Sequence, residues 1–196
     1  EYLEKATGKT LDVLVQEQFY KSIGMNYTTF NPLQRFPKDS IAPTEIDTYF
    51  RHQQIQGYVH DMEAAMEGGV GGHAGIFSNA MDVAKMMQLY LQKGKWNGKQ
   101  ILDSSFVAKS VKPRFAASPE YGYGWWLSTY KSKDVFYMRG HLGQLVIVIP
   151  TDNLIIVRLG HLGDKPKKGS PHSNDFYVYL EESYKMLDQE NTQKIQ

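Results

Sequence analysis

Residues 144–159 read Gln144-Leu-Val-Ile-Val-Ile149, then Pro150-Thr-Asp-Asn153, then Leu154-Ile-Ile-Val-Arg-Leu159. The two outer segments are rich in β-branched residues, and the polar, proline-containing segment between them is typical of a hairpin turn. Residues 121–130 and 135–139 are also strand-like, and the pattern predicts an amphipathic helix over 175–187. A closing order of strand, strand, strand and helix indicates an antiparallel meander that buries one face against a helix.

The preceding part of the chain is predicted to contain helices and loops in place of strands. Helical spacing of apolar residues predicts a helix between Thr10, as its N-cap, and Gly24, as its stop. Residues 26–58 show little periodicity and predict a long ordered loop, and Gly68–Gly75 predicts a tight backbone segment. Two more helices are expected, with Ser78 or Asn79 and Asp103 or Ser104 as caps. We therefore expect one partial domain over 1–196, mostly helix and loop over 1–115 and antiparallel strands plus a C-terminal helix over 116–196.

The composition is that of a globular protein. Of the 196 residues 41% are hydrophobic and 13% aromatic, and the net charge of +1 favours neither a nucleic-acid partner nor an anionic membrane surface. The absence of cysteine excludes disulfides and thiolate metal sites. No apolar run approaches the roughly 18 residues of a membrane span. The first residues, Glu1–Lys5, read like the middle of a helix, which suggests a piece of a longer protein.

The segment with most chemical promise is Gly140-His-Leu-Gly-Gln144, at the entrance to the apolar strand. Glycine there lets a substrate approach the backbone closely, and a strand N–H can donate to a developing oxyanion. A histidine beside it can titrate near neutral pH or donate a hydrogen bond. Taken locally, a turn histidine between two strands is the simpler interpretation.

The order of motifs along the whole chain changes that balance. Ile41–Glu45, Gly57–Asp61, Gly68–Ser78, Tyr121–Trp126 and Gly140–Gly143 follow one another before an aliphatic hairpin and a terminal helix. This order resembles the C-terminal portion of serine hydrolases of the class C β-lactamase and penicillin-binding-protein family. That family includes D-alanyl-D-alanine carboxypeptidases, esterases and 6-aminohexanoate-dimer hydrolases. The resemblance implies an α/β (α+β) fold of the β-lactamase/transpeptidase type, with an antiparallel sheet flanked by helices, of which only the C-terminal part is present.

The resemblance also implies roles for particular residues. His141-Leu142-Gly143 would be the third motif of the family, with His141 in the place of a cationic residue and the backbone N–H of Gln144 as half of an oxyanion hole. Leu142 and Tyr123 would contact the substrate. The first two motifs, Ser-x-x-Lys and Tyr-x-Asn, would lie upstream. Ser128-Thr-Tyr-Lys131 matches the first in letters only, because on a strand the two side chains do not share a helical face.

The implied chemistry is acyl transfer, without a metal or cofactor, on an amide, peptide or ester. β-Lactamases usually carry a hydroxyl residue in the middle of the third motif, and Leu142 cannot supply that hydrogen bond, which disfavours penicillins. The alternative function is a non-catalytic module that binds cell-wall peptides. The resemblance places the protein in a bacterial periplasm, cell envelope or extracellular space. We expect neither a nucleic-acid partner nor a membrane span in this chain, but self-association through exposed apolar surface is compatible with the sequence.

Two other motifs give weaker hypotheses. Gly69-Val-Gly71-Gly-His-Ala74 matches a loose dinucleotide fingerprint, but a polar stretch precedes it where a buried strand is required, so a tight loop is favoured. His60, Asp61 and His73 lack the spacing of known zinc motifs, and hydrogen-bonded loop residues are expected instead.

Overall fold

The computed structural model describes residues 2–162 and 172–195. Its contacts divide the chain into an N-terminal unit, Glu1–Met86, and a C-terminal unit, Met87–Gln196. The sequence predicts one partial domain, with helices and loops over 1–115 and strands plus a C-terminal helix over 116–196. That division stays a prediction.

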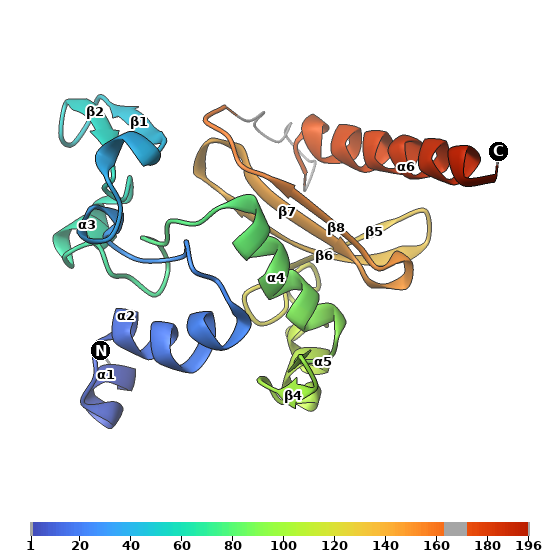
Figure 1. Ribbon diagram of the computed structural model, residues 1–196, viewed down its shortest axis with the longest axis horizontal. Coiled ribbons are helices and arrows are strands. Elements are labelled where there is room, and N and C mark those ends of the chain that lie inside the picture. The colour runs from blue at the N-terminus through green and yellow to red at the C-terminus, as the bar shows by residue number, and fades with distance from the viewer. Residues whose placement is uncertain (1, 163–171, 196) are drawn as a thin grey trace. The chain divides into compact units, whose positions relative to one another are not determined.

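The N-terminal unit consists of short helices, one hairpin and connecting turns (Figure 1). Its helices and strands are α1 (Tyr2–Thr7), α2 (Leu11–Val15), β1 (Pro43–Asp47), β2 (Gln53–Gln56) and α3 (Met62–Met66). α2 continues as a π-helical turn and then a 3-10 turn that ends at Gly24, where φ is +71°. The helical segment predicted between Thr10 and Gly24 is therefore confirmed, although only its first five residues are α-helical.

The expected long loop over 26–58 was wrong in one respect. Its second half contains the antiparallel hairpin β1–β2, in which Asp47 pairs with Gln53 and Ile46 with Gln54. Both strands are short and mostly polar, and Ile55 and Asp47 are their buried residues. Because the strands lack a continuous apolar alternation, the sequence carried little signal for them.

The helix α4 (Ala80–Leu91) begins where the sequence predicts. The side chain of Asn79 accepts a hydrogen bond from the N–H of Asp82 at 2.8 Å, as an N-cap residue does. Asp82, only 1% exposed, accepts from the N–H of Tyr27 at 2.7 Å and pairs with Lys85 at 3.0 Å. These bonds tie the start of α4 to the segment around Tyr27 in the N-terminal unit.

The C-terminal unit is built around a four-stranded antiparallel sheet in the order β5-β6-β7-β8. Its elements after α4 are β3 (Lys95–Trp96), β4 (Lys99–Gln100), α5 (Ser104–Ser110), β5 (Trp126–Tyr130), β6 (Lys133–Gly140), β7 (Gln144–Ile149), β8 (Leu154–Arg158) and α6 (Asn174–Ile195). The predicted meander and terminal helix are confirmed, and its four strands correspond to the four strand-like segments named from the sequence. The strand expected from Tyr121 begins only at Trp126, because the N–H of Gly122 donates to the carbonyl of Trp125 and closes a turn.

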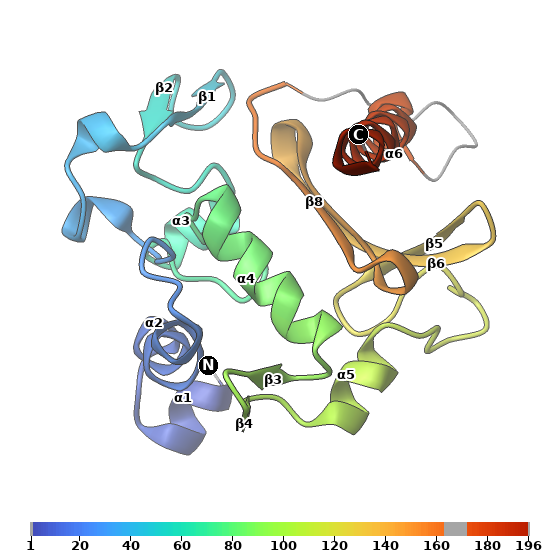
Figure 2. The ribbon, with the colours of Figure 1, turned by 45° about the vertical axis from the view of Figure 1, so that its right-hand side comes forward.

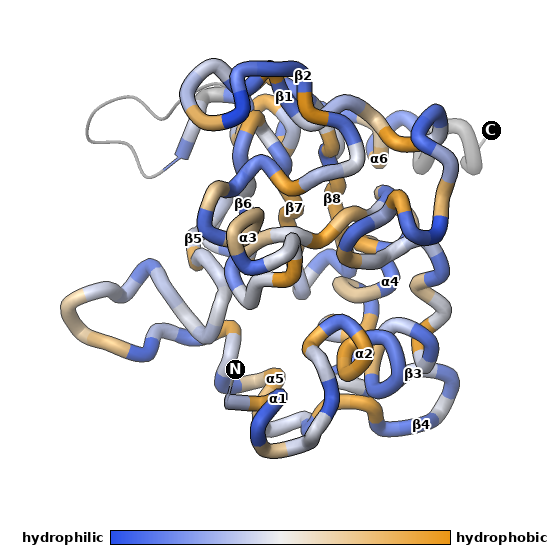
Figure 3. Tube along the Cα trace, turned by 90° about the vertical axis from the view of Figure 1, so that its left-hand side faces the viewer, coloured by the Kyte–Doolittle hydropathy of each residue, from blue (hydrophilic) through white to orange (hydrophobic). Residues whose placement is uncertain are grey.

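Both faces of this sheet are covered within the C-terminal unit. On one face α6 lies across the strands (Figures 1 and 2), and Phe176 and Leu180 pack among inward side chains such as Tyr137 and Ile147. On the other face Trp125 meets Tyr90 of α4 and Phe136 of β6. β7 lies between the two layers, is buried from Leu145 to Ile149, and is hydrophobic in Figure 3. A strand covered on both sides explains the unbroken apolar run quoted first.

Candidate functional site

The segment His141–Gly143 forms the turn that joins β6 to β7, and Gly140 and Gln144 pair at its base. The structure thus places His141 at a strand entrance, where the sequence put it, and also in a turn between two strands. His141 is exposed, and Leu142, Gly143 and Gln144 are half-buried. Leu142 has φ +56° and ψ +30°, and Gly143 has φ +86°. Leucine seldom adopts this left-handed backbone, so surrounding contacts must hold the turn in place.

Arg158, the last residue of β8, supplies such contacts. Its guanidinium Nη1 donates to the carbonyls of Leu142, at 3.3 Å, and Gly143. Its Nη2 donates to the carbonyl of Leu162. One planar cation therefore fixes two successive peptide groups of the turn and connects them to the chain beyond β8.

The side chain of Gln144 fixes the other end of the turn. Its Oε1 accepts from the N–H of Gly160 at 3.1 Å, and its Nε2 donates to the carbonyls of Gly160 and His141, the latter at 3.3 Å. This amide pair continues the contact between β7 and the chain after β8, past the last backbone pair, Leu145 with Arg158. The side chain of Gln144 therefore stabilises the turn, and its backbone N–H is the group predicted to stabilise an oxyanion.

The direction of the turn's N–H groups follows from these contacts. In a trans peptide the N–H points opposite to the C=O of the same group. Because Arg158 holds the carbonyls of Leu142 and Gly143 on its own side, the N–H groups of Gly143 and Gln144 project away from the guanidinium. Consecutive N–H groups that project in one direction are a geometry that can stabilise an anion.

Tyr123 lies in the irregular segment before β5 and is 49% exposed. Its ring stacks on Phe106 at a centroid distance of 6.4 Å, and the guanidinium of Arg114 lies 5.0 Å from its centre. These contacts fix the ring on the surface of the C-terminal unit. A role for Tyr123 and Leu142 in substrate binding stays a prediction.

A family comparison gives this geometry a context. The model of the family described as Beta-lactamase matches residues 1–172. The chain belongs to the β-lactamase family. The family resemblance inferred from the sequence is therefore confirmed. The apolar hairpin and the turn before it are parts of the β-lactamase-family domain.

Two curated relatives are similar to this chain in sequence. A protein named "Putative D-alanyl-D-alanine carboxypeptidase" from Escherichia coli (strain K12) is 32% identical over 189 residues, covering 84% of this chain and 43% of that protein. A protein named "N-acetylmuramyl-L-alanine amidase" from Bacillus subtilis (strain 168) is 33% identical over 180 residues, covering 80% and 40%. The β-lactamase-family chain thus spans less than half the length of these curated relatives.

Solved structures support the same fold. A "Putative 6-aminohexanoate-dimer hydrolase from Bacillus anthracis" matches with a TM-score of 0.57 and 21% identity, covering 97% of this chain and 41% of that one. Simvastatin synthase (LovD) from Aspergillus terreus matches with a TM-score of 0.58 and 16% identity, covering 83% and 47%. At these identities the matches show the β-lactamase/transpeptidase-like fold alone.

One side-chain cluster of this β-lactamase-family chain was missed by sequence reasoning. The buried ring of His172, 5% exposed, lies with Nε2 2.8 Å from Oγ of Ser128 and Nδ1 3.0 Å from the hydroxyl of Tyr137. It stacks on Phe176 at 4.2 Å. Ser128 therefore contacts a histidine, and the ammonium of Lys131 lies over the rings of Tyr130 and Tyr184 instead. The cluster joins β5 and β6 to the start of α6.

We expect this cluster to make the free energy of unfolding of the C-terminal unit depend on pH. Burial, and secondly the positive charge of Arg139, lower the pKa of His172. The unfolded chain, with a histidine pKa of about 6.5, then binds more protons than the folded chain. Stability contributed by neutral His172 is thus present above pH about 6.5 and is lost as the pH falls below it, with a slope of at most about 1.4 kcal/mol per pH unit. Urea unfolding between pH 5 and 8 measures this slope.

Replacing His172 by phenylalanine removes the titrating group and should flatten the dependence. His161→Gln, at an exposed position beyond β8, is the matched control and should keep the wild-type slope. An unchanged slope in His172→Phe would contradict the assignment.

The glycine-rich segment follows the loop interpretation. A helix, α3, precedes it in place of the strand that a dinucleotide site requires. Nε2 of His73 lies 3.1 Å from Oδ1 of Asp61, which also caps α3 through the N–H of Ala64. The hydrogen bonds from Ala64 and, next, from His73 lower the pKa of Asp61. Across residues 2–162 and 172–195, no group of three or more His, Asp or Glu side chains could hold a metal ion.

Proposed function

We propose that this chain forms one wall of the acyl-transfer site of a hydrolase that acts on an amide, peptide or ester substrate. The observation that supports the proposal is the direction of the N–H groups of Gly143 and Gln144, on the side opposite Arg158. A tetrahedral intermediate carries its negative charge on the former carbonyl oxygen, and two fixed N–H donors would stabilise that charge. Arg158 and Gln144 hold the turn through hydrogen bonds that need no substrate, so little reorganisation would be needed at the moment of reaction.

The nucleophile in this proposal is a serine hydroxyl on polypeptide outside these 196 residues. Its oxygen attacks the substrate carbonyl, an adjacent base takes its proton, and the leaving amine or alcohol departs to give an acyl-enzyme that water hydrolyses. His141, exposed beside the two N–H donors, would donate a hydrogen bond to the substrate or to the leaving group.

Leu142 disfavours β-lactams, and the names of the relatives favour cell-wall peptides or amides as substrates. A location in the cell envelope follows from the same substrates. Among the described residues no helix is long and apolar enough to cross a membrane.

The test uses the full natural polypeptide that contains this chain. We expect a burst of p-nitrophenol from a p-nitrophenyl ester and an acyl adduct detectable by mass spectrometry. In His141→Ala the acylation rate should fall by about 10²-fold, because general acid–base or hydrogen-bonding groups contribute on this scale, while the unfolding midpoint stays within error. His161→Ala, exposed in the same unit, is the matched control.

Unchanged acylation in His141→Ala would remove that residue from the proposed site. The isolated 196-residue chain should hydrolyse neither the ester nor a chromogenic cephalosporin. Turnover by the isolated chain that disappears in Ser128→Ala would replace the proposal with a site at the Ser128–His172 contact.

A further inference from the structure

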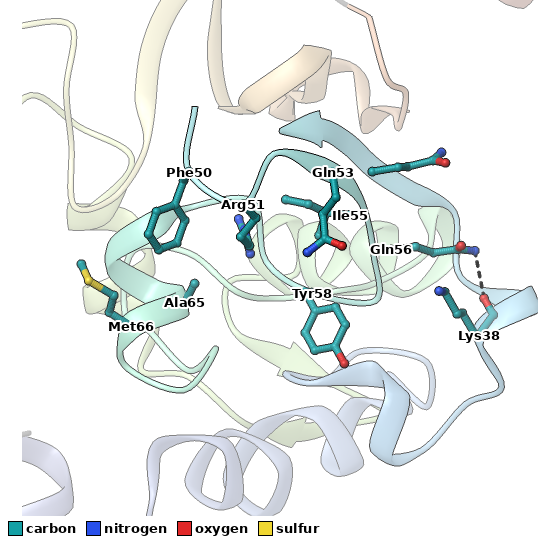
Figure 4. A pocket seen from close by; sticks show the side chains of 10 residues that line it. Lys38, Phe50, Arg51, Gln53, Ile55, Gln56, Tyr58, Ala65 and Met66 are labelled. Carbon is teal, nitrogen blue, oxygen red and sulfur yellow. Dashed lines mark hydrogen bonds between the residues drawn. The ribbon is translucent and has the colours of Figure 1, made fainter. Parts of the chain in front are cut away.

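The N-terminal unit contains a cavity of about 470 Å³ that no step above uses. β2, the 3-10 turn that contains Lys38, and α3 supply its walls, and Figure 4 shows the side chains around it. It is lined by Lys38, Phe50, Arg51, Gln53, Gln54, Ile55, Gln56, Tyr58, Ala65 and Met66. This volume lies within the range of small-molecule sites and suits a ligand the size of a di- or tripeptide.

The framework of the cavity is held by a buried ion pair. Asp47, with 0% of its side chain exposed, pairs with Nε of Arg51 at 3.1 Å. The two remaining guanidinium nitrogens of Arg51 donate to the carbonyls of Val59, at 2.7 Å, and His60, at 2.6 Å. Arg51 therefore supports the wall through its contacts, and its charge is balanced by Asp47.

The side-chain amide of Gln56 holds another wall of the cavity. Nε2 of Gln56 donates to the carbonyl of Lys38 at 3.1 Å (Figure 4). It also donates to the carbonyl of Ile41 at 2.7 Å. The neighbouring Gly57 has φ +80°, and a Cβ there would lie 2.6 Å from Cγ of Leu33. The hydrogen bond from Gln56 thus holds the backbone of Lys38 beside β2, and the packing at Gly57 holds the neighbouring segment at Leu33.

The charge of the cavity is positive. No acidic side chain is among its lining residues. The ammonium of Lys38 takes part in none of the ion pairs found among the described residues, in contrast to Arg51. An anionic group on the ligand would complement this lysine.

The other side chains that line the cavity are either apolar or carry an amide group. Phe50, Tyr58 and Met66 are 40%, 59% and 71% exposed, which is much apolar surface for residues around one opening. The amide of Gln53 can both donate and accept hydrogen bonds. Together these groups match backbone amides and small apolar side chains more closely than they match a phosphate, for which several cations or grouped N–H donors would be expected.

We propose that this cavity binds a short acidic peptide. Its carboxylate would pair with Lys38, its backbone amides would bond to Gln53 and to Oε1 of Gln56, and its apolar side chain would contact Phe50 and Met66. This binding goes beyond the acyl-transfer proposal and is independent of it. The measurement below needs no turnover, so binding can fail while hydrolysis stands, and hydrolysis can fail while binding stands.

The experiment titrates N-acetyl-Ala-Glu into the full natural polypeptide that contains this chain, labelled with ¹³C at its methionine methyl groups. Met66→Leu assigns the reporter signal. We expect a saturable shift of the Met66 methyl group with the acidic dipeptide and a weaker response to its neutral analogue, N-acetyl-Ala-Gln. Lys38→Gln should weaken binding of the acidic dipeptide about tenfold or more, because a charge-assisted bond is lost. Lys38→Arg should bind within a few-fold of the wild-type chain.

The matched control is Lys21→Gln, which removes an exposed lysine from the same unit outside the cavity lining. It should leave the affinity unchanged. Equal binding of the acidic and neutral dipeptides, equal affinity in Lys38→Gln and wild type, or no Met66 shift at millimolar peptide would each overturn the proposal.

Discussion

In the full natural polypeptide, Gly143→Val is expected to lower kcat for ester hydrolysis by about 10²-fold or more. Valine tolerates φ +86° poorly, so the turn must move, and the N–H groups of Gly143 and Gln144 move with it. A displacement of about 1 Å, or loss of one oxyanion donor, costs about 10²-fold in rate. Stopped-flow measurement of the acylation burst and of steady-state turnover gives kcat and KM separately.

The control for this variant is Gly98→Val. Gly98 has φ +78° in the turn between β3 and β4, and no atom lies within 4 Å of the position that a Cβ would take there. This substitution therefore reproduces the backbone strain away from His141–Gly143. Both variants should lose similar stability, and only Gly143→Val should lose kcat. Equal turnover in the two variants would contradict the role given to the turn.

Replacing Asp47 by alanine is expected to destabilise the N-terminal unit by about 10 °C or more in its unfolding midpoint. The buried carboxylate accepts from the N–H groups of Tyr49, Phe50 and Arg51 at 3.0, 2.8 and 3.0 Å, and from Nε of Arg51. Removing it leaves these donors and the Arg51 charge without their acceptor. Differential scanning calorimetry measures the midpoint, and Asp39→Ala, at an exposed position in the same unit, is the control.

The same carboxylate gives a pH signature. Burial raises the pKa of Asp47, but the hydrogen bonds from Phe50, Tyr49 and Arg51 outweigh burial and hold the pKa well below its usual range. The stability it contributes is therefore present above the unfolded value of about 4 and is lost as the pH falls below that value. Asp47→Ala should show a flatter acid limb than Asp39→Ala. Parallel acid limbs in the two variants would contradict this account.

The sheet was predictable because its signals are local. Gln144–Ile149 and Leu154–Leu159 are adjacent apolar runs joined by turn residues, and the structure pairs them with Ile149 opposite Leu154. The caps were predictable for the same reason, since Asp103 accepts from the N–H of Phe106 only three residues away. The hairpin β1–β2 was missed because it has few buried apolar residues, and the start of β5 was misplaced because the turn closed by Gly122 is hidden in an aromatic run.

The candidate site was only partly predictable. Gly140–Gln144 could be found from its glycines and the strand that follows. The hydrogen bonds from Arg158 to the carbonyls of Leu142 and Gly143 depend on strand register. These partners lie 16 and 15 positions from Arg158 in the sequence. The contacts of His172 with Ser128 and Tyr137 span 44 and 35 positions. Neither set of partners has a fixed spacing that a motif search could use.

Each strand of the four-stranded sheet pairs with its neighbour along the chain, through connections of two to four residues. Closing such short loops costs little chain entropy, and proteins dominated by local contacts fold quickly. Residues 126–158 should therefore assemble early in refolding, as a template on which α6 later docks. In the function proposed above, the polypeptide that contributes the nucleophile would then meet an edge of the proposed site that has already formed, with the turn between β6 and β7 in its left-handed conformation.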